Sequence, residues 1–232
     1  MNFGFTEEQN LLREQVSRFM AEACSMAKVR ELMATEDGFD DTLWRQVSEL
    51  GWLGLTIPEK FGGLGLKWID LAVVLEECGR GLCPLPVASQ ALTTAAVARC
   101  GSDDHKANWL PSMADGSAVC TLALYDEPNW IDPAAITLTG ARVPGAVRIS
   151  GVKPFVSDAM AAQYFLLGVR VDDSLALAAL SKDQVEVTAE PVMDRTKGHR
   201  AVSFSQDRAS TIKYILKNVC CFSLLHTRIC DF

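Results

Sequence analysis

Apolar and polar positions change their period once along this chain of 232 residues. Up to residue 115 the apolar positions recur every three or four residues, as in Leu12, Val16 and Phe19, which is the spacing of one helix face. Beyond residue 116, short β-rich runs are separated by Gly, Pro, Asp and Ser. The pattern predicts an α+β chain, with an all-α helical domain over residues 1–115 followed by an antiparallel β-barrel or sandwich domain over residues 116–208.

Caps and stops predict five helices in the first domain. Thr6 and Gln9 have the spacing of a capping box, and Gly51 and Gly101 stand where helices should end. The five helices are expected to begin after Thr6, after Asp40, at Trp68, after Ser89 and after Ser102.

Residues 51–66, between the second and third predicted helices, are too apolar to be solvated and too rich in glycine to form a strand or helix. Leu53, Leu55 and Ile57 are expected to face a core, and Pro58 stops the extended run. The glycines that follow supply backbone angles that a side chain would forbid. We therefore expect a packed turn.

Seven β-rich runs follow, with the turn signals typical of an antiparallel barrel or sandwich. They cover residues 118–125, 135–139, 147–152, 164–171, 175–180, 185–189 and 201–204. Residues 209–232 fit neither pattern and hold three of the eight cysteines. Two interpretations of this atypical tail stay open: an ordinary terminal helix or strand, and an end foreign to the fold, as a premature stop or frameshift would leave.

The net charge of −7, without any cluster of Lys and Arg, excludes nucleic acid and anionic membranes as expected partners. The first residues do not resemble a secretory signal and no apolar run could cross a bilayer, so we expect a cytoplasmic protein. The eight cysteines include no C-x-x-C pair, and only three histidines are present. We therefore expect reduced, mostly buried thiols and no metal site.

Several segments, in order and spacing, resemble the acyl-CoA dehydrogenase family over residues 1–206. Ile57-Pro-Glu-Lys-Phe-Gly-Gly-Leu-Gly65 is similar to that family's connection between early helices. Lys153-Pro-Phe-Val-Ser-Asp158 is similar to its Lys-x-Trp-Ile-Thr-Asn segment, and Cys120-Thr-Leu-Ala-Leu-Tyr-Asp-Glu-Pro128 to its strand that ends in Thr-Glu-Pro. Residues 163–169 and 195–204 fit the strands that follow.

The resemblance implies FAD as cofactor. Phe155 stands where the family's Trp packs on the flavin, and Ser157 where its Thr hydroxyl hydrogen-bonds the ring. Asp126 stands at the Thr of Thr-Glu-Pro, where an ionised carboxylate would repel electron-rich flavin oxygens. The candidate cofactor-binding residues are Leu124, Tyr125, Asp126, Phe155, Val156 and Ser157.

The resemblance also implies α,β-dehydrogenation of an acyl-CoA thioester, with electron-transfer flavoprotein and other acyl-CoA dehydrogenase chains, in homo- or hetero-oligomers, as partners. In the family the base is a glutamate of a C-terminal helical domain. We do not find that domain in this sequence. We assign no catalytic residue and expect a truncated chain that is incomplete alone, with an exposed apolar face including Phe165.

Pro84-Leu-Pro86 and the departure from Thr-Glu-Pro resemble a bacterial branch of the family, whose members handle bulky or cyclic acyl chains. This resemblance suggests fatty acid or steroid catabolism. Two alternatives stay open. One is a non-catalytic partner subunit of a heteromeric acyl-CoA dehydrogenase, and the other is a non-functional remnant.

Overall fold

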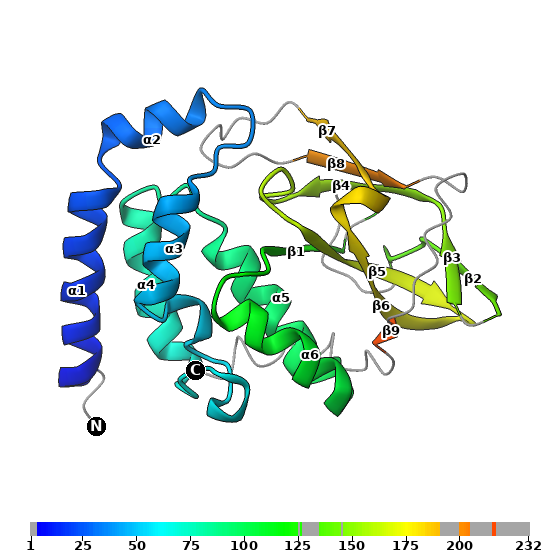
Figure 1. The fold of residues 1–232 in the computed structure, drawn as a ribbon, viewed down its shortest axis with the longest axis horizontal. Coiled ribbons are helices and arrows are strands. Elements are labelled where there is room, and N and C mark those ends of the chain that lie inside the picture. The colour runs from blue at the N-terminus through cyan, green and yellow to red at the C-terminus, as the bar shows by residue number, and fades with distance from the viewer. Residues whose placement is uncertain are drawn as a thin grey trace.

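The structure is a computed structural model and describes residues 4–124, 126, 135–144, 146–190, 200–204 and 215–216. Helices form one end of the molecule and strands the other, with α5 and α6 next to the strands (Figure 1). The α-helices are α1 Glu7–Ala23, α2 Met26–Met33, α3 Asp41–Glu49, α4 Trp68–Arg80, α5 Val87–Cys100 and α6 Asp103–Ala114. Two short 3-10 helices, η1 Trp52–Gly54 and η2 Glu59–Phe61, lie between α3 and α4.

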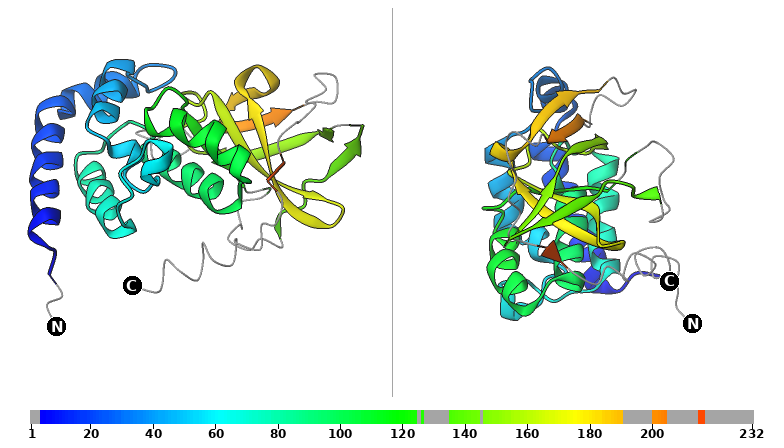
Figure 2. Two further views of the ribbon diagram at one scale, coloured as in Figure 1. Left: turned by 60° about the horizontal axis from the view of Figure 1, so that its bottom comes forward. Right: turned by 90° about the vertical axis from the view of Figure 1, so that its right-hand side faces the viewer.

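The strands form three sheets whose inner faces share one apolar core. Their orders are β1-β5-β6-β9, β2-β3 and β4-β8-β7, and β1 with β5 is the parallel pair among otherwise antiparallel ladders. The two views of Figure 2 show these sheets packed at one end of the molecule. The strands are β1 Cys120–Ala123, β2 Gly140–Val143, β3 Ala146–Ile149, β4 Gly151–Val156, β5 Tyr164–Val171, β6 Ser174–Ser181, β7 Glu186–Ala189, β8 Arg200–Phe204 and β9 Ile215–Leu216. Over the described strands the arrangement is sandwich-like rather than a closed barrel.

The α+β prediction is confirmed, and four of the predicted helices begin where expected. Thr6 forms the expected capping box, and Ser102 caps α6 as expected, through a capping box with His105. The helix α2 was missed because Ser25 caps it directly after the end of α1, with no glycine or proline between them. The start of α5 is corrected: it begins at Val87, so Ser89 lies inside its first turn and does not cap it.

The glycine-rich turn is packed as predicted. Leu53, Leu55 and Ile57 are each at most 5% exposed. Gly62 has a φ of 83°, which favours glycine. Gly63 is required for space instead, because a Cβ there would lie 2.1 Å from the carbonyl oxygen of Ile57.

Two strand predictions and one prediction of an exposed face are corrected. The run at 147–152 is two strands, β3 and β4, divided at Ser150. The run at 135–139 contributes only an isolated bridge from Thr139 to Arg170, and β2 follows it unpredicted. Phe165, expected on an exposed apolar face, is 1% exposed in the sandwich core, so that prediction is wrong.

Buried hydrogen bonds join the helical end to the first strand. The Gln90 side chain is fully buried, donating to the carbonyl oxygens of Met113 (3.0 Å) and Ala118 (2.9 Å) and accepting from the Cys120 N–H (2.8 Å). The Trp44 indole N–H donates to the carbonyl oxygen of Gly116 (2.8 Å) in the same region. Helices and strands therefore share polar contacts that water does not reach.

The five described cysteines are free thiols, and four of them are buried: Cys24, Cys78, Cys83 and Cys120. Burial raises the pKa of the Cys120 thiol to about 12. A hydrogen bond with Cys83, together with burial, raises the pKa of Cys24. These two thiols stay protonated at neutral pH, as inert core residues do.

Candidate functional site

A β-bulge in β4 turns one aromatic side chain out of the sandwich. Lys153 pairs with Val202 and Val156 with Arg200, so β4 has one residue more than β8 over this stretch. Regular alternation would place Phe155 on the face of Lys153. The extra residue instead buries Val156 (2% exposed) and leaves Phe155 41% exposed.

The backbone in the bulge and just after it is strained. Phe155 has a φ of 53° and Asp158 a φ of 54°, both in the left-handed region. Such angles cost a non-glycine residue about 1–2 kcal/mol each, more readily tolerated by Asp than by Phe. The Phe155 N–H donates to a carboxylate oxygen of Glu190 (2.7 Å), and the Ser157 carbonyl oxygen accepts from the Thr121 hydroxyl (2.8 Å).

A buried ion pair connects this bulge to the end of β1. The fully buried Lys153 ammonium donates to a carboxylate oxygen of Asp126 and to the Leu124 carbonyl oxygen (2.9 Å). The second carboxylate oxygen accepts from the N–H groups of Thr137 and Leu138, the latter at 2.9 Å. The negative charge at Asp126 is therefore compensated inside the protein.

The pKa values of this pair move in the same direction for different reasons. Burial raises the pKa of the Asp126 carboxyl, but the hydrogen bond from Lys153 and those from backbone N–H groups outweigh it, so the net shift is downward. Burial lowers the pKa of Lys153, and its bond to Asp126 opposes that change.

The structure brings most of the sequence-predicted residues together. Leu124 and Asp126 lie beside the bulge through Lys153, and Ser157 is tied to β1 through Thr121. The Val156 side chain belongs to the sandwich core. Tyr125 lies outside the described residues, as does most of the tail. Sequence reasoning missed Lys153 as the connecting residue, although its place at the head of the quoted motif was visible.

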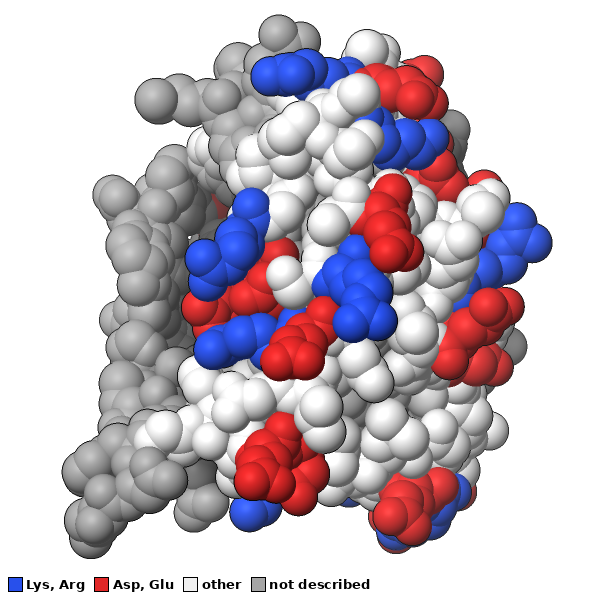
Figure 3. Space-filling model, turned by 90° about the vertical axis from the view of Figure 1, so that its left-hand side faces the viewer, with Lys and Arg blue, Asp and Glu red and all other residues white. Residues whose placement is uncertain are grey.

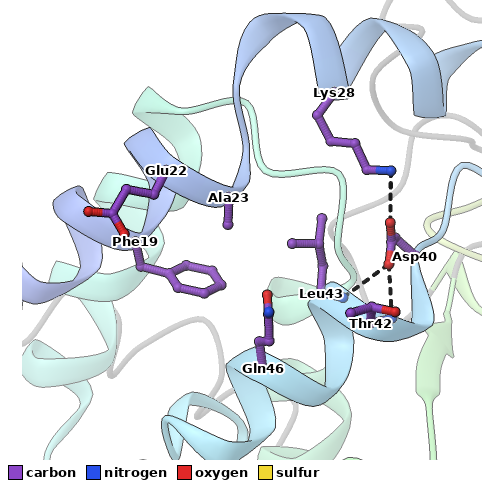
Figure 4. Close-up of a pocket in the computed structure, with 8 residues that line it drawn as sticks. All are labelled: Phe19, Glu22, Ala23, Lys28, Asp40, Thr42, Leu43 and Gln46. Carbon is purple, nitrogen blue, oxygen red and sulfur yellow. Dashed lines mark hydrogen bonds and ion pairs between the residues drawn. The ribbon is translucent and has the colours of Figure 1, made fainter.

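A separate pocket of about 540 Å³ opens between α1, α2 and α3 (Figure 4). Phe19 and Leu43 provide its apolar side, and the Lys28 ammonium lies 3.0 Å from the Asp40 carboxylate. Asp40 also accepts from the Thr42 N–H (2.8 Å), as the N-cap of α3. Lys28 and Asp40 are engaged in holding the helices, and none of the predicted site residues lines the pocket.

Charges of both signs mingle on the helical face of the molecule, without a patch of one sign (Figure 3). In the helical part of the chain, Glu76 accepts from Arg13 and from Arg80, each at 2.9 Å. Among the described residues, no three His, Cys, Asp or Glu side chains are grouped to hold a metal ion. No helix in the described part of the chain is long and apolar enough to span a bilayer.

Comparisons with known proteins agree with this architecture. Residues 6–117 match the family model described as "Acyl-CoA dehydrogenase, N-terminal domain". Over 126 residues the chain is 37% identical to the acyl-CoA dehydrogenase IpdE2 of Mycobacterium tuberculosis, covering 54% of this chain and 38% of that protein. Over 179 residues it is 32% identical to FadE12 of the same organism, covering 75% and 45%. The chain thus spans less than half the length of these curated relatives.

Two solved structures share the fold. The ChsE4-ChsE5 complex of Mycobacterium tuberculosis superposes with a TM-score of 0.84 at 24% identity, covering 98% of this chain and 61% of that one. An acyl-CoA dehydrogenase of Bacillus anthracis, solved in complex with FAD, gives a TM-score of 0.76 at 18% identity, covering 97% and 41%. The first of these neighbours is a complex of two named chains, and the second binds FAD.

Proposed function

Because this chain belongs to the acyl-CoA dehydrogenase family, we propose that it forms part of an FAD site at which an acyl-CoA thioester is oxidised between its α and β carbons. Residues 1–115 would be the helical domain of this site, residues 116–208 its β domain and residues 209–232 an atypical tail. The single observation that carries the proposal is the exposed, strained Phe155 on the β4 bulge, at the position of the family's flavin-contacting Trp.

The described residues fit a flavin in two respects. Phe155 offers an aromatic face with nearly half of its surface exposed, which suits packing on a planar ring. Asp126 does not bring an uncompensated charge to this edge, since Lys153 and two backbone N–H groups engage it. The repulsion expected from the sequence is therefore removed by pairing.

Bound FAD would supply the hydride acceptor for the β-hydrogen, while a base removes the α-proton. In this chain Phe155 would pack on the ring and Ser157 would hydrogen-bond it, with backbone atoms of Leu124 and Val156 along the same edge. We assign no base to the described residues. The role of these residues is to bind and orient.

The resemblance and the relatives support a substrate class and a set of partners. A bulky acyl chain of fatty acid or steroid origin would be the substrate, and electron-transfer flavoprotein would receive the electrons. The chain would work in the cytoplasm with acyl-CoA dehydrogenase chains, either copies of itself or a different chain as in the ChsE4-ChsE5 complex.

Titration of the purified chain with FAD tests this function. We expect quenched flavin fluorescence, a shifted visible absorption spectrum and FAD that stays with the protein through gel filtration. Phe155→Ala should abolish these changes. Val152→Ala is the matched control, because Val152 is an apolar residue of the same strand and is 52% exposed. A wild-type chain that is colourless after incubation with FAD and gel filtration would contradict the proposal.

A second candidate function is that of a non-catalytic partner subunit. The Asp126–Lys153 pair favours it, because the side chain at the family's flavin-contacting Thr position is used inside the protein. Co-expression with a complete acyl-CoA dehydrogenase chain encoded nearby, followed by gel filtration, should then give a joint peak. Separate elution of the two chains would exclude this function.

A further inference from the structure

Residues 155–158, which begin inside the bulge, adopt a shape that their own sequence does not favour. Both ends of this segment, Phe155 and Asp158, have positive φ angles without being glycine. Strained angles of this kind persist only where surrounding groups determine them. Groups outside the segment must therefore hold it in this shape.

Side chains from three different parts of the chain form hydrogen bonds with the segment. Glu190, after β7, accepts from the Phe155 N–H at 2.7 Å. Thr121, on β1, donates to the Ser157 carbonyl oxygen at 2.8 Å. Ser89, in the first turn of α5, donates to a carboxylate oxygen of Asp158 at 2.5 Å. Each partner is at least 35 residues away along the sequence.

The two hydroxyl donors are sheltered from water. Thr121 is 1% exposed and Ser89 is 7% exposed. A buried hydroxyl needs a hydrogen-bond partner, and a bond to a carboxylate is of the stronger, charge-assisted kind. Ser89 is also a helix residue whose side chain contacts the strand end of the molecule, so α5 and the β4–β5 connection are fixed relative to one another.

We propose that Ser89, Thr121 and Glu190 are positioning residues that hold residues 155–158 in the flavin-binding shape before FAD arrives, an inference that rests on the proposed function. A segment ordered in advance loses less conformational entropy on binding, so its affinity for the ligand is higher. Through Ser89, the helical domain thereby determines the geometry of a binding edge that lies on the β domain.

Four variants and a control test the proposal. Thr121→Val and Ser89→Ala remove one donor each, and Thr121→Ser and Glu190→Gln retain the bonding group. Thr94→Val is the matched control: Thr94 is a buried α5 residue, 1% exposed, whose hydroxyl contacts the Met113 sulfur instead. Each variant is titrated with FAD, and amide hydrogen exchange of residues 155–158 is measured without FAD.

We expect Thr121→Val and Ser89→Ala to weaken FAD binding by about tenfold each, with faster exchange in residues 155–158 and a changed absorption spectrum of the bound flavin. Thr121→Ser, Glu190→Gln and the Thr94→Val control should behave as wild type. A merely structural role would lower thermal stability without changing the spectrum of the bound flavin.

Two failures can be told apart. If the wild-type chain binds FAD and both donor-deletion variants bind it equally well, the positioning role is wrong while the proposed function stands. If the wild-type chain binds no FAD, the proposed function fails. The amide hydrogen exchange is measured without FAD and is informative in that case too. If exchange in residues 155–158 is unchanged in Thr121→Val and Ser89→Ala, these residues do not hold the segment.

Discussion

Lys153 is a long, charged side chain, yet it is 0% exposed. Its ammonium is stable there because Asp126 and the Leu124 carbonyl oxygen accept hydrogen bonds from it. Removing one member of a buried ion pair leaves the other as an uncompensated charge, which is costlier than removing both.

Lys153→Met should therefore lower the free energy of unfolding by about 3–5 kcal/mol. The double variant Lys153→Met with Asp126→Asn should be more stable than the single one, because no buried charge is left. Urea denaturation followed by circular dichroism measures both. A single variant as stable as wild type would show that the pair is hydrated in solution.

The same carboxyl predicts a pH dependence. The folded-state pKa of Asp126 is lowered below its usual 3.8, so its stabilisation is present above that value and is lost as the pH falls through the lowered pKa. Asp126→Asn should be less stable than wild type at pH 6, and the difference should shrink below about pH 4. Denaturation curves at several pH values check this, and a constant difference would contradict it.

At the level of the element, two glycines are constrained for different reasons and a third is unconstrained. Gly63, in the turn after α3, is excluded from bearing a Cβ by the Ile57 carbonyl oxygen, whereas Gly62 is constrained by its φ of 83°. Gly79, inside α4, has open space where a Cβ would stand, with no atom within 4 Å beyond its own helix backbone and chain neighbours, and its φ is not positive.

Gly63→Ala should lose about 3 kcal/mol of stability, because the turn must open to accept the methyl group. Gly79→Ala should instead gain about 0.5–1 kcal/mol from helix propensity, which makes it a control for the substitution itself. Thermal unfolding of both variants provides the measurement. Equal effects of the two would mean that the turn adapts freely.

Much of the element pattern could be predicted from the sequence, because caps and apolar periods are local signals. Thr6, Asp40 and Ser102 mark helix starts by side chains that bond their own first turn. Ser89 looks the same in sequence, yet its hydroxyl bonds Asp158, 69 residues away. The choice between these partners depends on tertiary packing.

The candidate site shows the same division. The order of its motifs predicts Phe155 and Ser157 as site residues, but the outward turn of Phe155 depends on a bulge that is set by pairing with β8. The partner of Asp126 likewise lies 27 residues away, on a strand that was merged with its neighbour in the sequence prediction. Pairing register is a non-local property.

Across the whole molecule, the buried bonds at Gln90 predict that helices and strands unfold together. Its amide satisfies backbone groups of both α6 and β1. Far-ultraviolet circular dichroism and tryptophan fluorescence should therefore report one coincident thermal transition. Two separated transitions would instead indicate independent units.

Gln90→Met keeps the volume of the side chain and leaves three buried backbone groups without this partner. We expect a loss of about 3 kcal/mol in unfolding free energy and divergence of the two transitions. Gln46→Met, at an exposed position of α3, should change stability by no more than about 0.5 kcal/mol.

The buried cysteines allow the opening rates of the regions around them to be measured. Cys24, Cys78 and Cys83 lie in the helical core cluster, whereas Cys120 lies where α5 meets β1. An alkylating reagent reaches each sulfur only when its surroundings open. Mass spectrometry after timed alkylation would thus rank the opening rates of the two regions in one sample. Alkylation of all four thiols at the same rate would indicate that the two regions open together.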